Sequence, residues 1–448
     1  MRLETRKMLD RSFTASGVLA IILMTAALVI LLAPMFARGA GAIFFTATVE
    51  HRRLMMEKFE RGSRTEIEAE VAAAKAARAP VYEMMAAYEK QLDAMPSADR
   101  RKMLPAFKDL KKALHALLGP APGSLRPMLM RDQFGQTRWD RAQVKLERVL
   151  YREEWDYSRP ERGSVKVLKP RADDFADTAL APLFSYLSAN LEKMLRPRKT
   201  VYWQFLTDES FDSHFFGGIW PELLGTFYLT VGAMLFAIPM GLIAAIYLTE
   251  YAPENAFVSF LRTCISTLAG VPSIVFGLFG LAFFINTLGV SHSKSVLVGS
   301  MTLALMILPT VIRASEEAIL AVPRTYKEAA LSLGAGRWHT VMTIILPAAL
   351  PGILTGIVIS MGRAAGETAP IIFTAAVSVG KPLSLLQVFS HPTPALSWNI
   401  YNLATEHEAM DEIRHVQYGL VLVLVTLVLL LNLAAILMRA RIAKRLRG

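Results

Sequence analysis

Six long, strongly apolar stretches of this sequence contain no Asp, Glu, Lys or Arg. They are Phe13–Ala37, Leu223–Thr249, Thr263–Ser293, Ser295–Ile312, Trp338–Gly362 and Val416–Met438. Each has at least 18 residues, and a helix needs about 20 apolar residues to cross the hydrocarbon core of a bilayer. The chain is also 53% hydrophobic, which is high for a soluble domain. We therefore predict an all-α membrane protein with six transmembrane helices, of which Ser295–Ile312 is the shortest.

Basic residues in the short connections favour one orientation in the membrane. With a cytoplasmic N-terminus, the inside segments hold Arg2, Arg6, Lys7, Arg11, Arg262, Arg313, Arg324, Lys327, Arg337, Arg439, Arg441, Lys444, Arg445 and Arg447, and the outside loops hold Lys294, Lys381 and Arg414. Cytoplasmic loops carry an excess of Lys and Arg, so we predict a multi-pass inner membrane protein with both termini in the cytoplasm. The net charge of +11 then reflects topology. We expect no binding to nucleic acid, because basic patches with stacking aromatic residues are absent from the sequence.

The first apolar stretch has a second interpretation. Its basic flank and the Ala40-Gly41-Ala42 sequence would also fit a cleaved signal peptide. The stretch is long for the apolar part of a signal peptide, so we expect a retained membrane anchor. The single cysteine, Cys264, begins the third stretch, and we expect a small buried apolar residue there.

The chain divides into three parts. Residues 1–37 are a basic leader with the first span, residues 38–218 are a charged soluble segment, and residues 219–448 are a core with five closely spaced spans. The orientation above places the segment 38–218 on the outer, periplasmic side, since loops of this length translocate whatever their charge.

The first half of the soluble segment is rich in helix-forming residues. We predict helices over 54–70, 71–90 and 102–118, with interruptions at Pro80, Pro96 and Pro105 and a linker over 119–123. The segment has no pattern typical of a nucleophile, a metal site or a phosphate site. A mostly helical binding or spacer module is therefore the simplest interpretation.

A short pattern lies between the fourth and fifth spans, over residues 324–347. Its residues are Glu328, Ala329, Ala330, Gly334, Ile344, Leu346 and Pro347. Thr325 and Glu328 have capping-box spacing, which predicts a helix that begins at Tyr326, and Gly334 suits the left-handed position that ends it. A second helix should run through Trp338 into the fifth span. Glu328 alone could merely cap a helix, but the whole spacing resembles the coupling loop on which the ATPase of an ABC importer docks.

The fifth span contains two charges within its apolar pattern. Charges at such depth are costly and usually face a pathway or each other. Arg363 and Glu367 are four residues apart and share one face of a helix. Gly362 and Gly366 have the spacing that lets another helix approach closely, and Pro370 interrupts helical hydrogen bonding.

This pair has chemistry suited to an oxyanion. An arginine can donate to two oxygens of a tetrahedral anion at once. A carboxylate can accept the proton of hydrogen phosphate and repels sulfate, which has no proton to offer. The alternative is a structural salt bridge that holds two spans together. Arg313, at the cytoplasmic end of the fourth span, is a second cation, although an anchor neutralised by Glu316 or Glu317 explains it equally well.

Several strings together resemble one family of permeases. They are Gly218-Ile219-Trp220-Pro221, Gly225-Thr226-x-Tyr228-Leu229, Tyr247-Leu248-Thr249-Glu250-Tyr251, the loop 324–347 and Arg363-Ala364-Ala365-Gly366-Glu367-Thr368-Ala369-Pro370. Over about 200–440 they resemble the A-type permease subunit of the phosphate-specific ABC importer. The insert at about 38–200 departs from the compact members of that family.

The resemblance implies a type I ABC importer permease that works by alternating access. It implies a C-type permease subunit as partner, two cytoplasmic ATPase subunits and a periplasmic phosphate-binding protein. It also implies that Arg363, Glu367, Thr368 and Arg313 line the phosphate path. Two alternatives remain: a permease for sulfate, molybdate or phosphonate, and a membrane-anchored sensor that uses residues 38–218.

Two other sequence patterns bear on whether this chain binds ATP or a metal. The pattern of a phosphate-binding loop is absent, since Gly380-Lys381 is followed by Pro382, so ATP is expected to be bound by a partner. We expect no enzyme activity and no cofactor. His407, Asp411 and His415 have helical spacing that could ligate a metal, but a solvated face before the last span explains them more simply.

Overall fold

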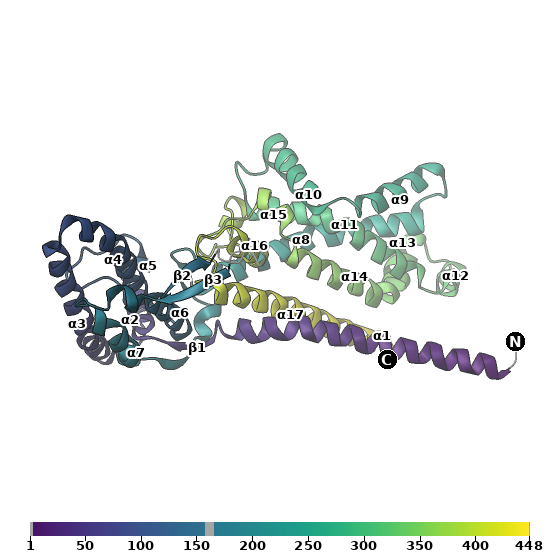
Figure 1. Cartoon of the computed structure of the whole chain (residues 1–448). Helices are drawn as coiled ribbons and strands as arrows, with labels where there is room; N and C mark the ends of the chain where they lie inside the picture. The colour runs from purple at the N-terminus through teal and green to yellow at the C-terminus, as the bar shows by residue number, and fades with distance from the viewer. Residues whose placement is uncertain (1–2, 157–164, 448) are drawn as a thin grey trace. The chain divides into compact units, whose positions relative to one another are not determined.

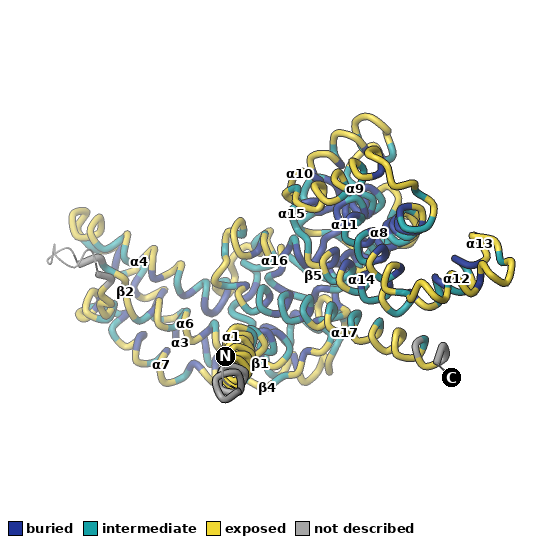
Figure 2. Tube along the Cα trace, turned by 90° about the vertical axis from the view of Figure 1, so that its right-hand side faces the viewer, coloured by how far each residue is buried: buried dark blue, intermediate teal, exposed yellow. Residues whose placement is uncertain are grey.

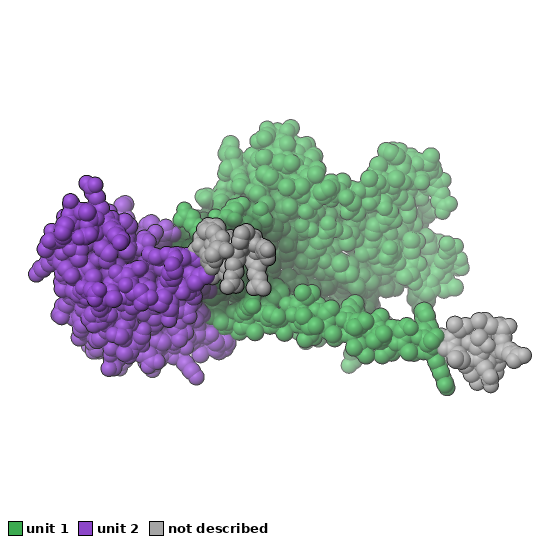
Figure 3. All heavy atoms as spheres, viewed as in Figure 1, with its two compact units in different colours: residues 1–42, 203–448 green, residues 43–202 purple. Residues whose placement is uncertain are grey.

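The computed structural model describes residues 3–156 and 165–447. The chain forms two compact units: Met1–Ala42 with Trp203–Gly448, and Ile43–Tyr202 (Figure 3). We call the first the membrane unit and the second the insert unit. Helices predominate in both (Figure 1).

The membrane unit contains most of the long helices. Its elements are α1 (Leu3–Ala40), the turn η3 (Trp203–Leu206), β5 (Ser210–Phe211), β6 (Phe216–Gly217), α8 (Trp220–Ile246), the π-helical turn η4 (Tyr247–Tyr251), α9 (Ala256–Leu268), α10 (Ser273–Gly280), the π-helical segment η5 (Leu281–Thr287), α11 (Val296–Leu320), α12 (Arg324–Ser332), α13 (Arg337–Thr340), the π-helical turn η6 (Val341–Ile345), α14 (Leu346–Gly366), α15 (Ala369–Thr374), η7 (Gln387–Phe389), α16 (Leu396–Thr405) and α17 (Arg414–Arg447).

Within the described residues, five helical stretches are long and apolar enough to span a membrane. They are Arg11–Ala40, Trp220–Tyr251, Val296–Leu320, Arg337–Gly366 and Arg414–Ile442. Five of the six predicted spans are therefore confirmed as single stretches. Ser295–Ile312, predicted as the shortest, extends to Leu320.

The predicted span Thr263–Ser293 is wrong as one straight helix. It is a pair, Ala256–Leu268 and Ser273–Thr287, bent by 101° at the break. Pro272 caps the second helix; it has no N–H to continue the first helix, and its ring disfavours the helical conformation at the preceding residue. Cys264, expected to be buried, is exposed on α9.

Helix α11 forms the centre of the membrane unit. It has the largest buried share of the five candidate spans, 67% of its most apolar window, against 0% for the stretch that contains α1. Glycines let its neighbours approach closely. A Cβ added to Gly241 of α8 would lie 2.7 Å from Val311, and Cβ atoms added to Gly352 and Gly356 of α14 would lie 2.7 and 2.2 Å from the Cβ atoms of Ala318 and Ala314. Small residues four apart are a common means of close helix packing in membranes.

The first helix packs against the last. Near its end, Arg38 Nη1 donates to the Tyr418 hydroxyl at 2.7 Å, and a Cβ added to Gly39 would lie 2.7 Å from the Leu422 Cβ. From Phe13 onward, α1 exposes most of its large apolar side chains, and Figure 2 colours this part mostly as exposed; lipid tails are as apolar as these side chains.

The insert unit is a helical domain with short strands. Its elements are β1 (Phe44–Ala47), α2 (Val49–Phe59), α3 (Arg64–Ala94), α4 (Ser97–Leu118), α5 (Met130–Gln133), α6 (Trp139–Leu150), β2 (Tyr151–Asp156), β3 (Val165–Pro170), η2 (Arg171–Phe175), α7 (Ala181–Leu195) and β4 (Arg198–Val201). Strands β1 and β4 pair antiparallel, with Phe44 opposite Val201. The chain therefore enters and leaves this unit side by side.

The predicted helices of the insert are present with different ends. Glu60 has a left-handed φ of 54° and ends α2, so the break falls before residue 64 and not at 70. Pro80 and Pro105 lie inside α3 and α4 and do not end them. The core that holds these helices includes Tyr88, Leu110, Leu117, Phe175, Leu183 and Leu187, all nearly inaccessible to solvent. Burial on this scale outweighs the helix-breaking tendency of a proline, about 3 kcal/mol.

The compact insert unit is shorter than the segment 38–218 because residues 203–218 pack with the membrane unit. The Ile219 N–H donates to the Phe205 carbonyl at 2.8 Å, and the Trp220 N–H donates to the Asp208 carbonyl at 3.0 Å. These bonds connect the β5–β6 hairpin and its approach to the first turn of α8.

The contact between α11 and α14 can be tested by exchanging one methyl group. Gly356→Ala would drive two Cβ atoms to 2.2 Å, so we expect about 1–3 kcal/mol of destabilisation, typical of overpacking. The double variant G356A/A314G should recover most of this loss. Thermal unfolding in detergent measures both. Gly366→Ala, at a glycine with open space around it, is the control, and equal unfolding temperatures for all variants would contradict close packing here.

His51 makes the insert unit sensitive to acid. Burial, with Arg138 and Arg52 nearby, lowers the pKa of His51 from 6.5 to about 3. The unfolded chain therefore takes up this proton more readily, and stability is lost as the pH falls from about 6.5 towards 3. We expect a loss of about 2 kcal/mol between pH 7 and pH 5. Hydrogen exchange of the insert core, corrected for intrinsic rates, measures it. A His51→Phe variant should lose much less, and equal pH dependence of both proteins would refute this role.

Candidate functional site

The helix that carries the predicted charged pair ends at the pair. Helix α14 stops at Gly366, Glu367 has extended backbone with φ −76° and ψ 133°, and α15 starts at Ala369 with Pro370 in its first turn. A proline at 370 removes the hydrogen bond to the carbonyl of residue 366, and its ring would clash with that carbonyl in a continuous helix. The sequence thus breaks the helix between Arg363 and the α15 turn.

The charged pair is accessible on the surface of this chain. Arg363 Nε lies 3.3 Å from Glu367 Oε1, and the two side chains are 40% and 22% exposed. The Glu367 backbone is held in place, because its carbonyl accepts a hydrogen bond from Ser397 Oγ at 3.0 Å. Thr368 is half-buried beside the pair. The side chains can therefore reach an anion while the backbone beneath them stays fixed.

The pair lies at the end of its own helical stretch, Arg337–Gly366, but level with the middle of α11. Gly356 faces Ala314 in the antiparallel contact between α14 and α11. Seven residues further along α14, Arg363 reaches the level of Ile307, near the middle of α11 (Val296–Leu320). A charged group exposed at this depth is costly against lipid and is normally found in a pathway or at a protein interface.

Within the described part of this chain, no helix approaches closely at Gly362 and Gly366. A Cβ added to Gly366 would meet nothing within 4 Å, and one added to Gly362 would make only ordinary contact with Val428, at 3.5 Å. The close approach within this chain occurs at Gly352 and Gly356, about three turns earlier. Spacing alone could not tell these two glycine pairs apart, because both fit the same pattern.

The structure does not bring Arg313 to the charged pair. Its Nη2 donates to the Arg262 carbonyl at 3.4 Å, about two helical turns from the level of Arg363, or roughly 9 Å along the axis. Neither predicted acid pairs with it among the described residues. Glu316 is nearly buried and pairs with Arg262 at 3.5 Å. From the sequence, Arg262 was interpreted only as a topology signal, so its contact with Glu316 was not predicted.

The loop 324–347 forms the predicted pair of helices. Leu333 is the C-cap of α12, and Gly334 follows with a φ of +84°. The Ala335 N–H donates to the Ala330 carbonyl at 3.1 Å, and the Gly334 N–H donates to the Leu331 carbonyl at 3.0 Å. This is a Schellman motif, so the predicted left-handed position at Gly334 is confirmed.

The predicted start of that helix is wrong. Helix α12 begins at Arg324 with Pro323 as N-cap, and no side chain caps it. Thr325 therefore lies inside the helix and forms no capping box. Proline presets the backbone angle needed at this end, which explains the earlier start.

Helix α12 exposes an apolar surface and is anchored to the spans. Large apolar side chains are exposed on this helix and just after it: Tyr326, Leu331, Leu333 and Trp338. Of the motif residues, Glu328 and Ala329 are exposed, Ala330 is buried, and Ile344, Leu346 and Pro347 are half-buried. Lys327 forms an ion pair with Glu250 at the end of α8. From the sequence, Glu250 was noted only within Tyr247-Leu248-Thr249-Glu250-Tyr251, one of the segments that resemble the permease family.

The segment after α12 leads directly into the core. Helix α13, the turn η6 and α14 form one continuous apolar stretch, Arg337–Gly366, as predicted. Val341 and Ile345 pack in a cluster with Ile246 of α8 and Ile319 of α11. The segment that follows α12 therefore packs against α8 and α11 and continues into α14.

The residues of the histidine pattern near the last span do not lie on one helix. His407 precedes the helix, with one ring nitrogen bonded to the Ser213 carbonyl at 2.9 Å, and Asp411 pairs with Arg414 at 2.7 Å. Helix α17 begins only at Arg414, so the assumed helical spacing does not exist. No group of three or more His, Cys, Asp or Glu able to hold a metal occurs among the described residues.

Comparison with known proteins matches the membrane unit. Residues 237–448 match the family model described as binding-protein-dependent transport system inner membrane component. The probable ABC transporter permease protein YqgI of Bacillus subtilis (strain 168) is 37% identical over 277 residues, which cover 60% of this chain and 91% of that protein. The phosphate transport system permease protein PstA 1 of Mycobacterium tuberculosis (strain ATCC 25618 / H37Rv) is 38% identical over 235 residues, 52% of this chain and 73% of that protein.

One solved structure among the matches is a bacterial ABC transporter involved in the import of the acidic polysaccharide alginate. It covers 54% of this chain and 84% of its own, with 15% sequence identity and a TM-score of 0.40.

The Schellman motif can be tested by a substitution at Gly334 that causes no steric clash. Gly334 has open space around it and a positive φ, so a side chain there is disfavoured by conformation alone. Gly334→Val should cost about 1–2 kcal/mol and speed hydrogen exchange of the last turn of α12 roughly tenfold. Gly334→Asn should exchange nearly like the wild type, because asparagine tolerates this conformation. Equal exchange in the Val and Asn variants would contradict the account.

Proposed function

Because this chain belongs to the family of binding-protein-dependent transport system inner membrane components, the permease subunits of ABC importers, we propose that it forms half of the translocation pathway of an ATP-driven phosphate importer. One observation carries the choice of substrate: an accessible Arg363–Glu367 pair at a helix break level with the middle of α11. Relatives whose names specify phosphate transport support the same choice.

The pair suits hydrogen phosphate in particular. The Arg363 guanidinium donates to two phosphate oxygens in a bidentate arrangement. Glu367 accepts the phosphate proton, and it repels sulfate, which has no proton at neutral pH. Thr368 adds a hydroxyl at the same break. Arg313 is a second cation on the side of α12 and receives the anion as the pathway opens towards the cytoplasm.

The second half of the pathway comes from a partner. We propose a C-type permease subunit that faces this chain, so that the exposed pair lines a shared passage. A periplasmic phosphate-binding protein delivers the anion from outside. The basic residues of the short loops favour both termini in the cytoplasm, which sets the insert unit outside and α12 inside.

ATP acts through two cytoplasmic ATPase subunits. We propose that each permease docks one of them on α12, where Tyr326, Leu331, Leu333 and Trp338 are exposed. Such exposed apolar groups are typical of a binding surface. Closure of the ATPases displaces α12, and the pairing of Lys327 with Glu250 and the packing around η6 carry that displacement into α8, α11 and α14. This chain itself supplies no nucleotide site and needs no cofactor of its own.

Uptake by an arginine variant tests the proposal. Arg363→Gln should reduce uptake of labelled phosphate by more than about tenfold, since a buried charge-assisted bond to the anion is lost, while assembly with the partner subunits is unchanged. Arg414→Gln, at an exposed arginine outside the pathway, is the matched control. Vesicles that hold this chain, its partner permease and the ATPase provide the assay.

Two outcomes would overturn this function. Normal phosphate uptake by the Arg363→Gln vesicles would exclude the pair from the pathway. Uptake of sulfate or molybdate by wild-type vesicles at the rate of phosphate would assign the chain to another oxyanion.

A further inference from the structure

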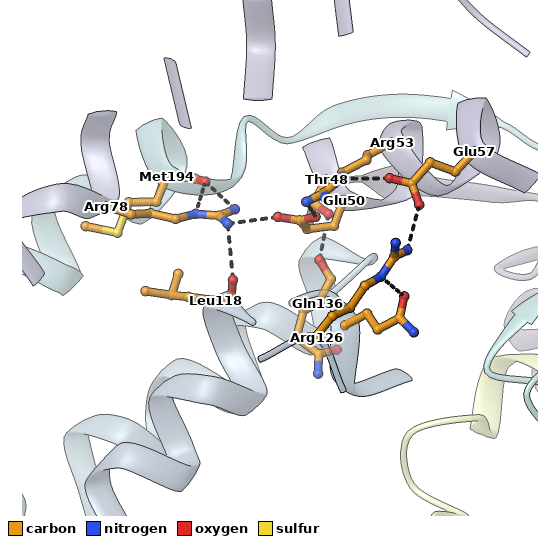
Figure 4. A network of polar contacts seen from close by, with 10 residues as sticks. Thr48, Glu50, Arg53, Glu57, Arg78, Leu118, Arg126, Gln136 and Met194 are labelled. Atoms are coloured by element: carbon orange, nitrogen blue, oxygen red, sulfur yellow. Dashed lines mark hydrogen bonds and ion pairs between the residues drawn. The ribbon is translucent and has the colours of Figure 1, made fainter. Parts of the chain in front are cut away.

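The insert unit contains a cavity of about 530 Å³. Its walls come from α2, α3, the segment that follows α4, and residues 133–135. The charged and hydroxyl groups that matter are Glu50, Arg53, Lys75, Arg78, Tyr82 and Arg126. Figure 4 shows Glu50 and Arg53 on one side of this region, with Arg126 reaching towards Glu57. Small-molecule sites in proteins commonly measure about 300–1,000 Å³.

A rigid, buried pair forms the base of the cavity. Arg78 donates from Nε and Nη2 to the Met194 carbonyl at 3.0 and 2.8 Å, and from Nη1 to the Leu118 carbonyl at 3.1 Å and to Glu50 Oε1 at 2.8 Å (Figure 4). Arg78 is 7% exposed and Glu50 4% exposed. These contacts hold the Glu50 carboxylate in one orientation.

The second oxygen of Glu50 has no hydrogen-bond donor. Glu50 Oε2 is inaccessible to bulk water and accepts no hydrogen bond, and its nearest cation is Arg53 Nη1 at 3.7 Å. Buried carboxylate oxygens are almost always hydrogen-bonded. Glu50 lines the cavity, and its Oε2 is an unsatisfied acceptor that a ligand hydroxyl would satisfy once the neighbouring Arg53 side chain moved aside.

Positive charge exceeds negative charge around the cavity by two. Arg53, Lys75, Arg78 and Arg126 are balanced only by Glu50 and by Glu57, which contacts Arg53 at 3.1 Å and Arg126 at 3.9 Å. Lys75 has no ion pair or hydrogen bond among the residues that the structure describes. It lies on the same face of α3 as Arg78 and Tyr82, at spacings of three and seven residues.

Tyr82 adds a donor on that face. Burial raises the pKa of its hydroxyl, with Arg78 acting in the opposite direction and Glu50 in the same direction. The hydroxyl therefore stays protonated at physiological pH and can donate to an anion. Prolines 120, 122 and 127 line the opposite side and suit a small apolar body.

We propose that this cavity binds a small hydroxylated organic dianion, such as a phosphate monoester of a polyol or a hydroxy-dicarboxylate. Its anionic group lies between Lys75 and Arg53, near the Tyr82 hydroxyl, and one of its own hydroxyls donates to Glu50 Oε2. The two excess positive charges match a dianion, and the volume exceeds that of a lone inorganic ion. This site is separate from the proposed transport pathway and does not depend on the transported substrate.

Calorimetric titration of the full-length chain, purified with its partner subunits, tests the proposal. Glycerol 3-phosphate and malate are the two dianionic probes, and glycerol, sulfate and inorganic phosphate are the comparisons. We expect one site for at least one probe, weakened about tenfold or more by Lys75→Met, since a charge-assisted hydrogen bond is lost. Binding of glycerol 3-phosphate would indicate a phosphate ester as ligand, and binding of malate would indicate a dicarboxylate. Glycerol should not bind, because it lacks the charge.

Variants on the wall of the cavity keep the test interpretable. Glu50→Gln would break the buried pair with Arg78 and could unfold the unit, so Lys75→Met and Tyr82→Phe are used instead. Lys90→Met, on the same helix but outside the cavity, is the matched control and should bind like the wild type. Absence of binding by both probes, binding unchanged by Lys75→Met, or equal affinity for inorganic phosphate or sulfate would each overturn the proposal. Phosphate transport would be unaffected by these results, since Arg363 is untouched.

Discussion

The break in the fifth span at Pro370 is the feature on which the membrane unit depends. A continuous helix would turn Arg363 and Glu367 into two charges on an apolar rod, at considerable cost in a bilayer. The missing N–H of the proline ends α14 at Gly366, and the extended Glu367 backbone is held by Ser397. The resulting irregular segment presents a cation and an acid level with the middle of α11. Irregular backbone at that depth is tolerated where it is buried in protein or lines a cavity.

The same helical stretch connects this break to the exposed loop. Arg337–Gly366 runs without interruption from α13 to the charged pair, about 45 Å at the rise of an α-helix. Its glycines pack tightly on α11, so it moves with α11 and not independently. Tightly packed interfaces tend to switch between discrete arrangements and do not deform gradually. A displacement of α12 is thus expected to move the Arg363–Glu367 pair together with α14 and α11.

The insert unit interrupts the chain without disrupting the helical core of the membrane unit. Its β1–β4 pairing brings entry and exit together, and its own core needs no residue from outside 43–202. An independent core also allows the unit to hold a ligand of its own. Its buried Arg78–Glu50 pair is hydrogen-bonded except at Glu50 Oε2, and Glu50 lines the cavity.

Local sequence patterns were enough to predict several features of the structure. Hydropathy alone located five spans, and the glycine at 334 marked the end of α12, because both depend on neighbouring residues. The tertiary structure decided what depends on residues distant in sequence. It placed the close contacts between α14 and α11 at Gly352 and Gly356, and it paired Glu316 with Arg262. It also assembled the cavity of the insert from four separate segments. The physical reason is that spacing specifies which face of a helix a residue occupies, whereas only packing specifies what that face meets.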